Sequence, residues 1–162
     1  MFVRTAGERD LAAIRALLVE TWHATYDAIY GVERVTEITD EWHSIAALKA
    51  RLTRPNSEFL VADDGKRLGG VAFAEGIDAG EQVVLRQLYV LPSLQGRGIG
   101  GMLLDEIIES FPEAHAVRLE VEAKNAKAIA FYEANGFVRT ADVGEHAGAS
   151  EPTLVFRRSL AG

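Results

Sequence analysis

The length, composition and charge of the chain exclude several classes of protein. Its 162 residues, 48% of them hydrophobic, suit one domain spanning residues 1–162 with a substantial core. The formal net charge is −7 and the isoelectric point is about 5.1, so we expect no nucleic-acid partner. The sequence has no cysteines, which excludes disulfides, thiolate metal sites and a cysteine nucleophile.

We also expect neither a targeting segment nor a metal. Met1 to Arg4 runs straight into a polar segment, which is not a signal-peptide pattern, and no apolar run approaches the roughly 18 residues of a membrane span. The four histidines lack the spacing of metal ligands. These patterns predict a cytoplasmic protein with no membrane partner and no bound metal.

The amino-terminal third is predicted to be mainly helical. Phe2 to Arg4 indicates a short strand, and Thr5-x-x-Glu8 is a capping-box pattern at the start of the first helix. Apolar residues at helical spacing continue to Gly31, whereas the polar stretch 33–41 is expected to be a loop. Residues 42–52 repeat the helical spacing, and a break follows at 54–57.

Three antiparallel strands are predicted next. The segments 59–62 and 68–75 flank Asp63-Asp64-Gly65-Lys66, which is a hairpin signal. A turn at 76–80 then leads to a strand at 82–91, which is rich in β-branched and aromatic residues. We expect this third strand to be largely buried.

A glycine-rich loop follows the third strand. Its sequence, after Pro92 and Ser93, is Gln95-Gly96-Arg97-Gly98-Ile99-Gly100-Gly101, and it leads into an amphipathic helix that ends before Pro112. The first backbone N–H groups of a helix have no intrahelical partner, and glycines let a phosphate approach them closely. Arg97 adds a positive charge beside them. The loop is therefore predicted to hold a diphosphate.

Three known phosphate-binding sequence motifs can be compared with this loop. The P-loop requires Gly-Lys followed by Ser or Thr, and Gly100-Gly101-Met102 supplies neither. A dinucleotide fingerprint is formally present as Gly96-x-Gly98-x-x-Gly101, but Leu91 to Gln95 separate it from its strand, and too little chain follows for a doubly wound sheet. The third pattern, Gln95-x-x-Gly98-x-Gly100, resembles the coenzyme A pyrophosphate motif of the GNAT superfamily of N-acetyltransferases.

A second stretch, residues 125–137, resembles another motif of that family. It has Asn125 at a helix start, then Phe131-Tyr132, then Gly136-Phe137 at the helix exit, and a predicted strand at 116–121 separates it from the first motif as in the family. Further strands are predicted at 137–140 and 153–160, around a loop at 144–149. The resemblance implies a mixed α/β (α+β) GNAT-like fold, with a mostly antiparallel sheet of about seven strands, a splayed and bulged central strand, and flanking helices.

The resemblance also implies roles in a direct transfer of the acetyl group of acetyl-CoA to a primary amine. Tyr132 would protonate the departing thiol, and the N–H of Val90 would donate to the oxyanion. The open edge at Leu88, Tyr89 and Val90 would pair with the pantetheine arm, which Asn125 would also contact. The residues implied to bind the pyrophosphate are Gln95, Gly96, Arg97, Gly98, Ile99, Gly100 and Gly101.

The acceptor and the oligomeric state are only partly implied. In the family the first helices wall the acceptor pocket, which makes Trp22, His23, Tyr26 and Tyr30 candidates, although such aromatic residues are as often ordinary core. The acceptor would be a small molecule, an amino acid, or a peptide or protein amine. Family habit implies a homodimer.

The general base is unassigned by sequence. Many family members carry a glutamate four residues before the equivalent of Leu88, and here that residue is Val84. Glutamates 75, 81, 120 and 122 are expected to be solvated, so a water-mediated relay, with Gln87 able to hold a water, is the expected route. The missing glutamate leaves an alternative open: a catalytically silent acyl-CoA-binding or sensing domain on the same fold.

Overall fold

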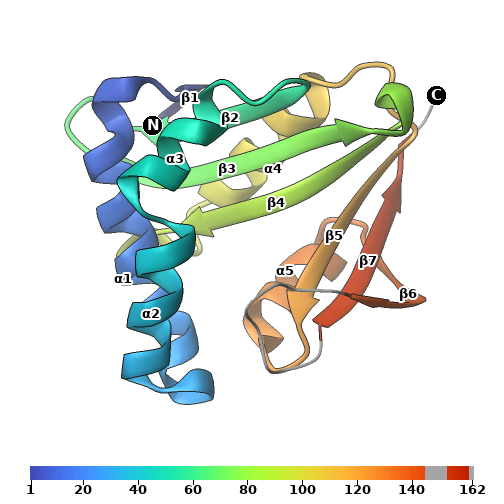
Figure 1. Ribbon diagram of the computed structural model, residues 1–162. Helices are drawn as coiled ribbons and strands as arrows, with labels where there is room; N and C mark the ends of the chain where they lie inside the picture. The colour runs from blue at the N-terminus through green and yellow to red at the C-terminus, as the bar shows by residue number, and fades with distance from the viewer. Residues whose placement is uncertain (145–152, 161–162) are drawn as a thin grey trace.

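The computed structural model describes residues 1–144 and 153–160, and within them the centre is one seven-stranded sheet (Figure 1). The strand order is β1-β2-β3-β4-β5-β7-β6, and every neighbouring pair is antiparallel except β4 and β5. This confirms the mixed α/β fold with a mostly antiparallel sheet. The strands are β1 (Phe2–Thr5), β2 (Ser57–Asp63), β3 (Leu68–Ile77), β4 (Gln82–Val90), β5 (Ala116–Glu122), β6 (Val138–Gly144) and β7 (Thr153–Ser159).

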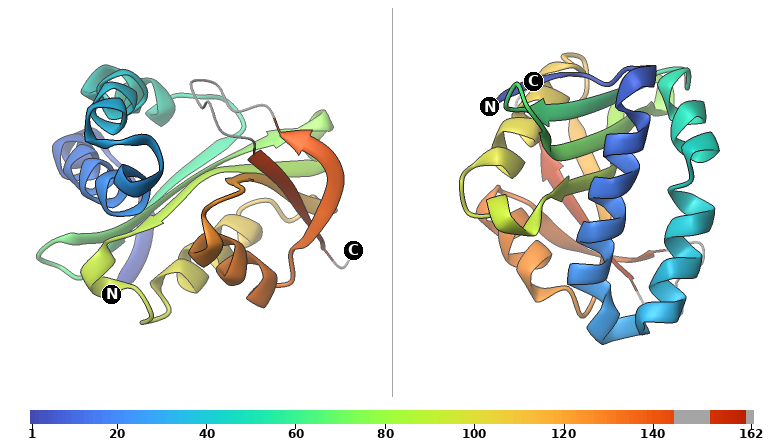
Figure 2. Two further views of the ribbon diagram at one scale, coloured as in Figure 1. Left: turned by 90° about the horizontal axis from the view of Figure 1, so that it is seen from below. Right: turned by 90° about the vertical axis from the view of Figure 1, so that its left-hand side faces the viewer.

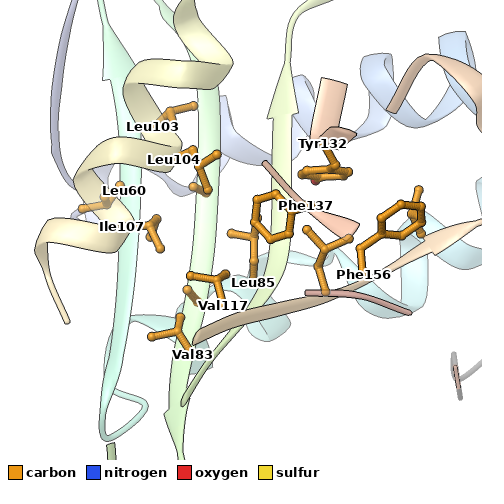
Figure 3. Close-up of a cluster of buried hydrophobic side chains, with 14 of the residues drawn as sticks. Leu60, Val83, Leu85, Leu103, Leu104, Ile107, Val117, Tyr132, Phe137 and Phe156 are labelled. Carbon is orange, nitrogen blue, oxygen red and sulfur yellow. The ribbon is translucent and has the colours of Figure 1, made fainter. Parts of the chain in front are cut away.

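Helices cover both faces of the sheet, with α1 to α3 on one face and α4 and α5 on the other (Figure 2). The alternation of side chains along β3 explains the two layers: Val71 and Phe73 pack with α1 and α3, whereas Ala72 and Ala74 pack with α4. Figure 3 shows the hydrophobic core on the α4 side of the sheet, to which α4 contributes Leu103, Leu104 and Ile107. The helices are α1 (Leu11–Tyr30), α2 (Val32–Trp42), α3 (Ile45–Leu52), α4 (Ile99–Glu109) and α5 (Ala126–Ala134).

The segment predicted to be a loop at 33–41 is helix α2, so that prediction was wrong. Val35 and Ile38, one turn apart, are its buried apolar residues, and they pack against Trp22 and Tyr26 of α1. Two buried apolar residues are too few for a clear periodic signal in the sequence. Trp42 ends α2 instead of opening the next helix, which begins at Ile45.

The predicted capping box at Thr5 and Glu8 does not form. A 3₁₀ turn, Glu8–Asp10, precedes α1, and the N–H of Gly7 donates to Asp10 Oδ2 at 2.7 Å. Arg4 adds two hydrogen bonds to the same carboxylate, at 2.8 and 2.9 Å. The Arg4 guanidinium holds the pKa of Asp10 down, from 3.8 to about 2. Asp10 therefore links β1 to the start of α1.

Replacing Asp10 by asparagine is expected to lower the free energy of unfolding by about 2 kcal/mol at pH 7. The folded-state pKa is depressed, so this stabilisation is present above the ordinary carboxyl pKa and is lost as the pH falls from about 4 to about 2. Thermal unfolding should show a melting temperature lower by roughly 4–8 °C. Glu8→Gln is the matched control, because the Glu8 side chain is 70% exposed. A larger loss from Glu8→Gln than from Asp10→Asn would contradict this assignment of the cap.

Strand β4 contains a bulge, and beyond it the edge of β4 toward β5 is unpaired. Phe73 pairs with Gln87 but Ala74 pairs with Leu85, which leaves Arg86 as the extra residue. β4 pairs with β5 only over Gln82 to Leu85, and beyond that point the two strands diverge (Figure 1). This confirms the splayed, bulged central strand. Within the described residues, no helix is both long enough and apolar enough to cross a membrane.

Candidate active site

The divergence of β4 and β5 opens a cleft of about 1170 Å³. Its walls come from α1, α2, α3, β4, the loop before α4, β5 and α5. This volume exceeds the roughly 300–1,000 Å³ of an ordinary small-ligand pocket. There is therefore room for an extended ligand together with a second reactant.

The open edge of β4 presents backbone amides to the cleft. Leu91 N donates to Gly69 O at 2.9 Å, so the next pair inward, Gly70 and Val90, is a non-hydrogen-bonded pair of the ladder. The N–H and C=O of Val90 therefore point away from β3, and Gln95 Nε2 indeed reaches Val90 O on that side at 3.2 Å. The same alternation turns the backbone of Leu88 toward the cleft, whereas that of Tyr89 faces β3.

The glycine loop presents a second set of amides. Gly96 and Gly98 have φ values of +81° and +84°, and Gly98 is the N-cap of α4 without a side-chain hydrogen bond from any described residue. The N–H groups of Ile99, Gly100 and Gly101 thus lack intrahelical acceptors. A Cβ placed on Gly96, Gly98 or Gly101 would meet no described atom within 4 Å. These amides border open space, an arrangement that fits a pyrophosphate.

Two further predicted loop residues act differently from the glycines. Arg97 is exposed and does not line the cleft. The side-chain amide of Gln95 is occupied by protein groups, because Nε2 donates to Val90 O and Oε1 accepts from Lys127 Nζ. Gln95 therefore ties the loop to β4 and α5, and we expect it to position the loop through these contacts.

Helix α5 enters the site through its N-cap and its packing on α4. Asn125 caps the helix as predicted, since its Oδ1 accepts from Ala128 N at 3.2 Å. Its Nδ2 donates to Tyr26 Oη at 3.3 Å, which links α5 to α1. Burial raises the pKa of Tyr26 to about 12, so its phenol is neutral at physiological pH. A Cβ on Gly100 would lie 3.1 Å from the Phe131 ring, so a larger residue here would require that ring to shift.

Tyr132 lies in the cleft and is 9% exposed. Its ring packs edge-on against Phe131 and Phe137, with centroids 5.3 and 5.5 Å apart (Figure 3). Burial, and secondarily Tyr26, raises the pKa of Tyr132 well above its usual value. The hydroxyl stays protonated at neutral pH, and it makes no hydrogen bond to any residue of 1–144 or 153–160. It is therefore available to donate to a ligand.

Three of the four predicted acceptor-pocket residues line the cleft. Trp22, Tyr26 and Tyr30 share one face of α1, with ring centroids 4.5 Å apart for the first pair and 5.7 Å for the second. His23 does not line the cleft, because the helix turns its side chain to a neighbouring face. There its Nδ1 lies 2.6 Å from Asp27 Oδ1. His23 therefore does not join the other three predicted residues at the cleft.

The glutamates divide into two groups, and the expectation that all are solvated was wrong. Glu75 and Glu122 are only 8% and 4% exposed. Glu75 is bound by Arg54 and by Arg86 Nε and lies outside the cleft, as does the exposed Glu81. Glu120 and Glu122, at alternate positions of β5, line the cleft, and Thr153 Oγ1 donates to Glu120 Oε1 at 2.9 Å. Val84 and Gln87 line it as well.

One wall of the cleft was not predicted from the sequence. This wall comes from α2, α3 and their junction, and its members are Ile38, Trp42, His43 and Arg51. The spacing of Val35 and Ile38 is consistent with a helix here but is too short to predict one. Within the described residues, no cluster of three or more His, Cys, Asp or Glu side chains could hold a metal ion.

Comparisons with known proteins agree with this geometry. Residues 12–137 match the family model of the acetyltransferase (GNAT) family. The chain is 31% identical over 138 residues to the peptidyl-lysine N-acetyltransferase YiaC of Escherichia coli, which covers 83% of this chain and 82% of that protein. It is 34% identical over 102 residues to the N-alpha-acetyltransferase RimI of Mycobacterium tuberculosis, covering 62% and 63%.

The fold has equally clear counterparts. The crystal structure of the PaiA N-acetyltransferase of Thermoplasma acidophilum, in complex with coenzyme A, superposes with a TM-score of 0.88. The identity is 23%, and the match covers 98% of each chain. The glycine-loop motif and the motif that begins at Asn125 both lie at one cleft, and the family match spans most of the chain. This chain therefore belongs to the GNAT family of N-acetyltransferases.

Proposed function

We propose that the protein transfers the acetyl group of acetyl-CoA to a primary amine by direct attack within a ternary complex. One observation carries this proposal: three kinds of hydrogen-bond donor meet around a single cleft. They are the outward-facing N–H of Val90, the uncapped amides at the start of α4, and the hydroxyl of Tyr132. Acyl transfer from a thioester needs donors for the oxyanion, the cofactor phosphates and the leaving group.

Each part of the cofactor has a set of residues that suits it. The amides of Gly96 to Gly101 would bind the pyrophosphate, and the outward backbone N–H and C=O of Leu88 would pair with the amides of the pantetheine arm. When bound, acetyl-CoA supplies a thioester: the amine nitrogen bonds to its carbonyl carbon, the C–S bond breaks, and the sulfur leaves as a thiolate. The Val90 N–H would donate to the carbonyl oxygen as negative charge develops there.

The protons require two routes. A lysine-type amine has a pKa near 10.4, so only about one in a thousand is neutral at physiological pH. We propose that this proton leaves through water to Glu120 or Glu122, which line the cleft. The Tyr132 hydroxyl donates a hydrogen bond to the departing thiolate, which then takes a proton from solvent. Because a thiol is more acidic than a phenol, and burial raises the pKa of Tyr132 further, the phenol keeps its own proton.

The acceptor end of the cleft suits an amine attached to an organic body. Trp22, Tyr26 and Tyr30 provide aromatic surface, and the two glutamates of β5 provide negative charge for a cationic amine. The relatives named as peptidyl-lysine and N-alpha-acetyltransferases support a peptide or protein amine as one acceptor class. Free amino acids and small amines are the other classes to test.

The test is thiol release from acetyl-CoA in the presence of amines from each class, with mass spectrometry of the product. The chain has no cysteines, so a thiol reagent reports only free coenzyme A. We expect release that depends on the amine, together with an N-acetylated product. Binding of acetyl-CoA with no amine-dependent release would instead favour the silent acyl-CoA-binding or sensing domain.

A further inference from the structure

Arg51, near the end of α3, brings a positive charge to the acceptor side of the cleft. Its Nη2 donates to the carbonyl of Trp42 at 2.6 Å and lies 3.3 Å from His43 Nδ1. Its Nη1 is buried and has no hydrogen-bond acceptor among residues 1–144 and 153–160. The same side chain lines the cleft.

No carboxylate of the described chain pairs with this guanidinium. The other arginines that make buried or partly buried contacts do have such partners: Arg4 pairs with Asp10, Arg15 with Asp40, and Arg86 with Glu75. A buried charge without a counter-ion is costly, and proteins normally pair it. The cleft thus contains a cation for which the described fold supplies no anion.

The protein contacts of Arg51 do not use all of its donors. The hydrogen bond to Trp42 holds the α2–α3 junction, and it occupies Nη2 alone. The guanidinium carbon lies 5.9 Å from the centroid of the Phe73 ring, a cation–π contact that stabilises the charge but accepts no N–H from Nη1. The N–H groups of Nη1 therefore remain for another partner.

The position of Arg51 indicates on which side of the cleft such a partner would bind. Trp22, one of the three aromatic residues that α1 contributes to the cleft, has its ring centroid 5.6 Å from that of His43 and 6.3 Å from that of Tyr89. Arg51 contacts His43 and thus belongs to the same wall. The acidic pair Glu120 and Glu122 lies on β5, a different wall of the cleft (Figure 1). The cleft therefore has two carboxylates, together with Arg118 of the same strand, on one wall and the Arg51 guanidinium on another.

We propose that Arg51 binds a carboxylate carried by the acceptor, so that the preferred substrates are amines with a carboxylate nearby. This inference rests on the proposed function and specifies its substrate class. The carboxylate would accept from Nη1, while the amine lies toward β5 and the thioester. Two sources have the right chemistry: the α-carboxylate of a free amino acid, and an acidic side chain next to the terminal amine of a peptide.

The experiment compares matched acceptor pairs that differ only in the carboxylate. One arm uses free amino acids and their α-amides, and the other uses peptides with Asp or Asn at the second position. The ratio of kcat/KM within each pair is measured for the wild type and for Arg51→Gln. We expect the ratio to fall by about 10- to 100-fold in the variant, mainly through KM, in the arm that matches the natural source. Comparing the two proteins cancels the difference in amine pKa within a pair.

Control variants separate this role from a structural one. Arg54→Gln removes an arginine three residues later that lies outside the cleft, and it should keep the wild-type ratio. Arg51→Lys keeps the charge and should retain part of the preference. In Arg51→Gln, acetylation of the amides and Asn peptides should fall much less than acetylation of the matching acids, whereas a general disruption of the α2–α3 junction would lower both alike.

A binding measurement keeps the inference distinct from the proposed function. The tryptophan fluorescence of the protein, which comes from Trp22 and Trp42 at this side of the cleft, is followed during titration with the same pairs, without acetyl-CoA. Preferential binding of the acids that Arg51→Gln abolishes would support the carboxylate site even if no acetyl transfer occurred. The proposed carboxylate site would be overturned if Arg51→Gln kept the wild-type preference. It would also be overturned if the wild type preferred neither the free amino acids nor the Asp peptides in both the transfer assay and the binding assay.

Discussion

Tyr132→Phe is expected to lower kcat by about 100-fold while leaving the affinity for acetyl-CoA within about twofold of wild type. The change removes only the hydroxyl, and the ring keeps its packing against Phe131 and Phe137. Because the hydroxyl makes no hydrogen bond within residues 1–144 and 153–160, its loss leaves no described protein group unsatisfied. Stability should therefore hardly change, and the loss should appear in turnover.

The measurement is steady-state thiol release at saturating amine, together with the dissociation constant of acetyl-CoA. Tyr26→Phe is the matched comparison, because it removes the hydroxyl that accepts from Asn125 Nδ2, and we expect it to change kcat by only a few-fold. The direction of the Tyr132 pKa shift adds a check: a phenol whose pKa is raised stays protonated, so kcat should not fall as the pH rises toward 10. Equal kcat values for Tyr132→Phe and wild type would refute the role of Tyr132 as hydrogen-bond donor to the leaving sulfur.

Gly98→Val is expected to weaken acetyl-CoA binding by about 100-fold. At φ +84° a β-branched residue is strained, and its side chain would project into the open space beside the free amides of α4. Those amides are the groups that we expect to hold the pyrophosphate. The dissociation constant can be measured by calorimetric titration of the folded variant.

Gly65→Val separates the strain from the loss of the phosphate site. Gly65 lies in the β2–β3 turn with φ +94°, and a Cβ placed on it would meet no described atom within 4 Å, so the same change imposes similar strain away from the cleft. Both variants should lose stability to a similar extent, yet only Gly98→Val should lose affinity. If both variants bind acetyl-CoA like wild type, the loop does not hold the cofactor.

The sequence identified those features that depend on local pattern. The hairpin at Asp63 to Lys66 and the helix after the glycine loop follow from turn chemistry and periodicity, and the structure has both. The N-cap at Asn125 follows from the residue type alone. The two family motifs then placed the remaining elements, because their order and spacing imply the sheet that joins them.

Features that depend on contacts between residues far apart in the chain could not be predicted from the sequence. Glu120 and Glu122 alternate with apolar residues along β5, a pattern that predicts a solvated face of the strand. In the structure that face forms one wall of the cleft, and Glu122 is buried. The bond between Tyr26 and Asn125 joins residues 99 positions apart. Arg51 is informative only because no described carboxylate comes near it, and this is a property of the whole fold. The predicted loop at 144–149 lies, except for Gly144, outside the described residues.

Thermal unfolding with acetyl-CoA, and with NADH and ATP as controls, tests most directly the central claim that this cleft holds acetyl-CoA. A ligand present at a hundred times its Kd adds about 2.7 kcal/mol to the stability of the folded state. For a domain of this size, that corresponds to a rise in melting temperature of roughly 5–10 °C. We predict such a rise with acetyl-CoA alone, and its loss in Gly98→Val. No rise with acetyl-CoA, or a rise with NADH instead, would contradict both the assignment of the Gly96 to Gly101 loop and the proposed acetyl transfer.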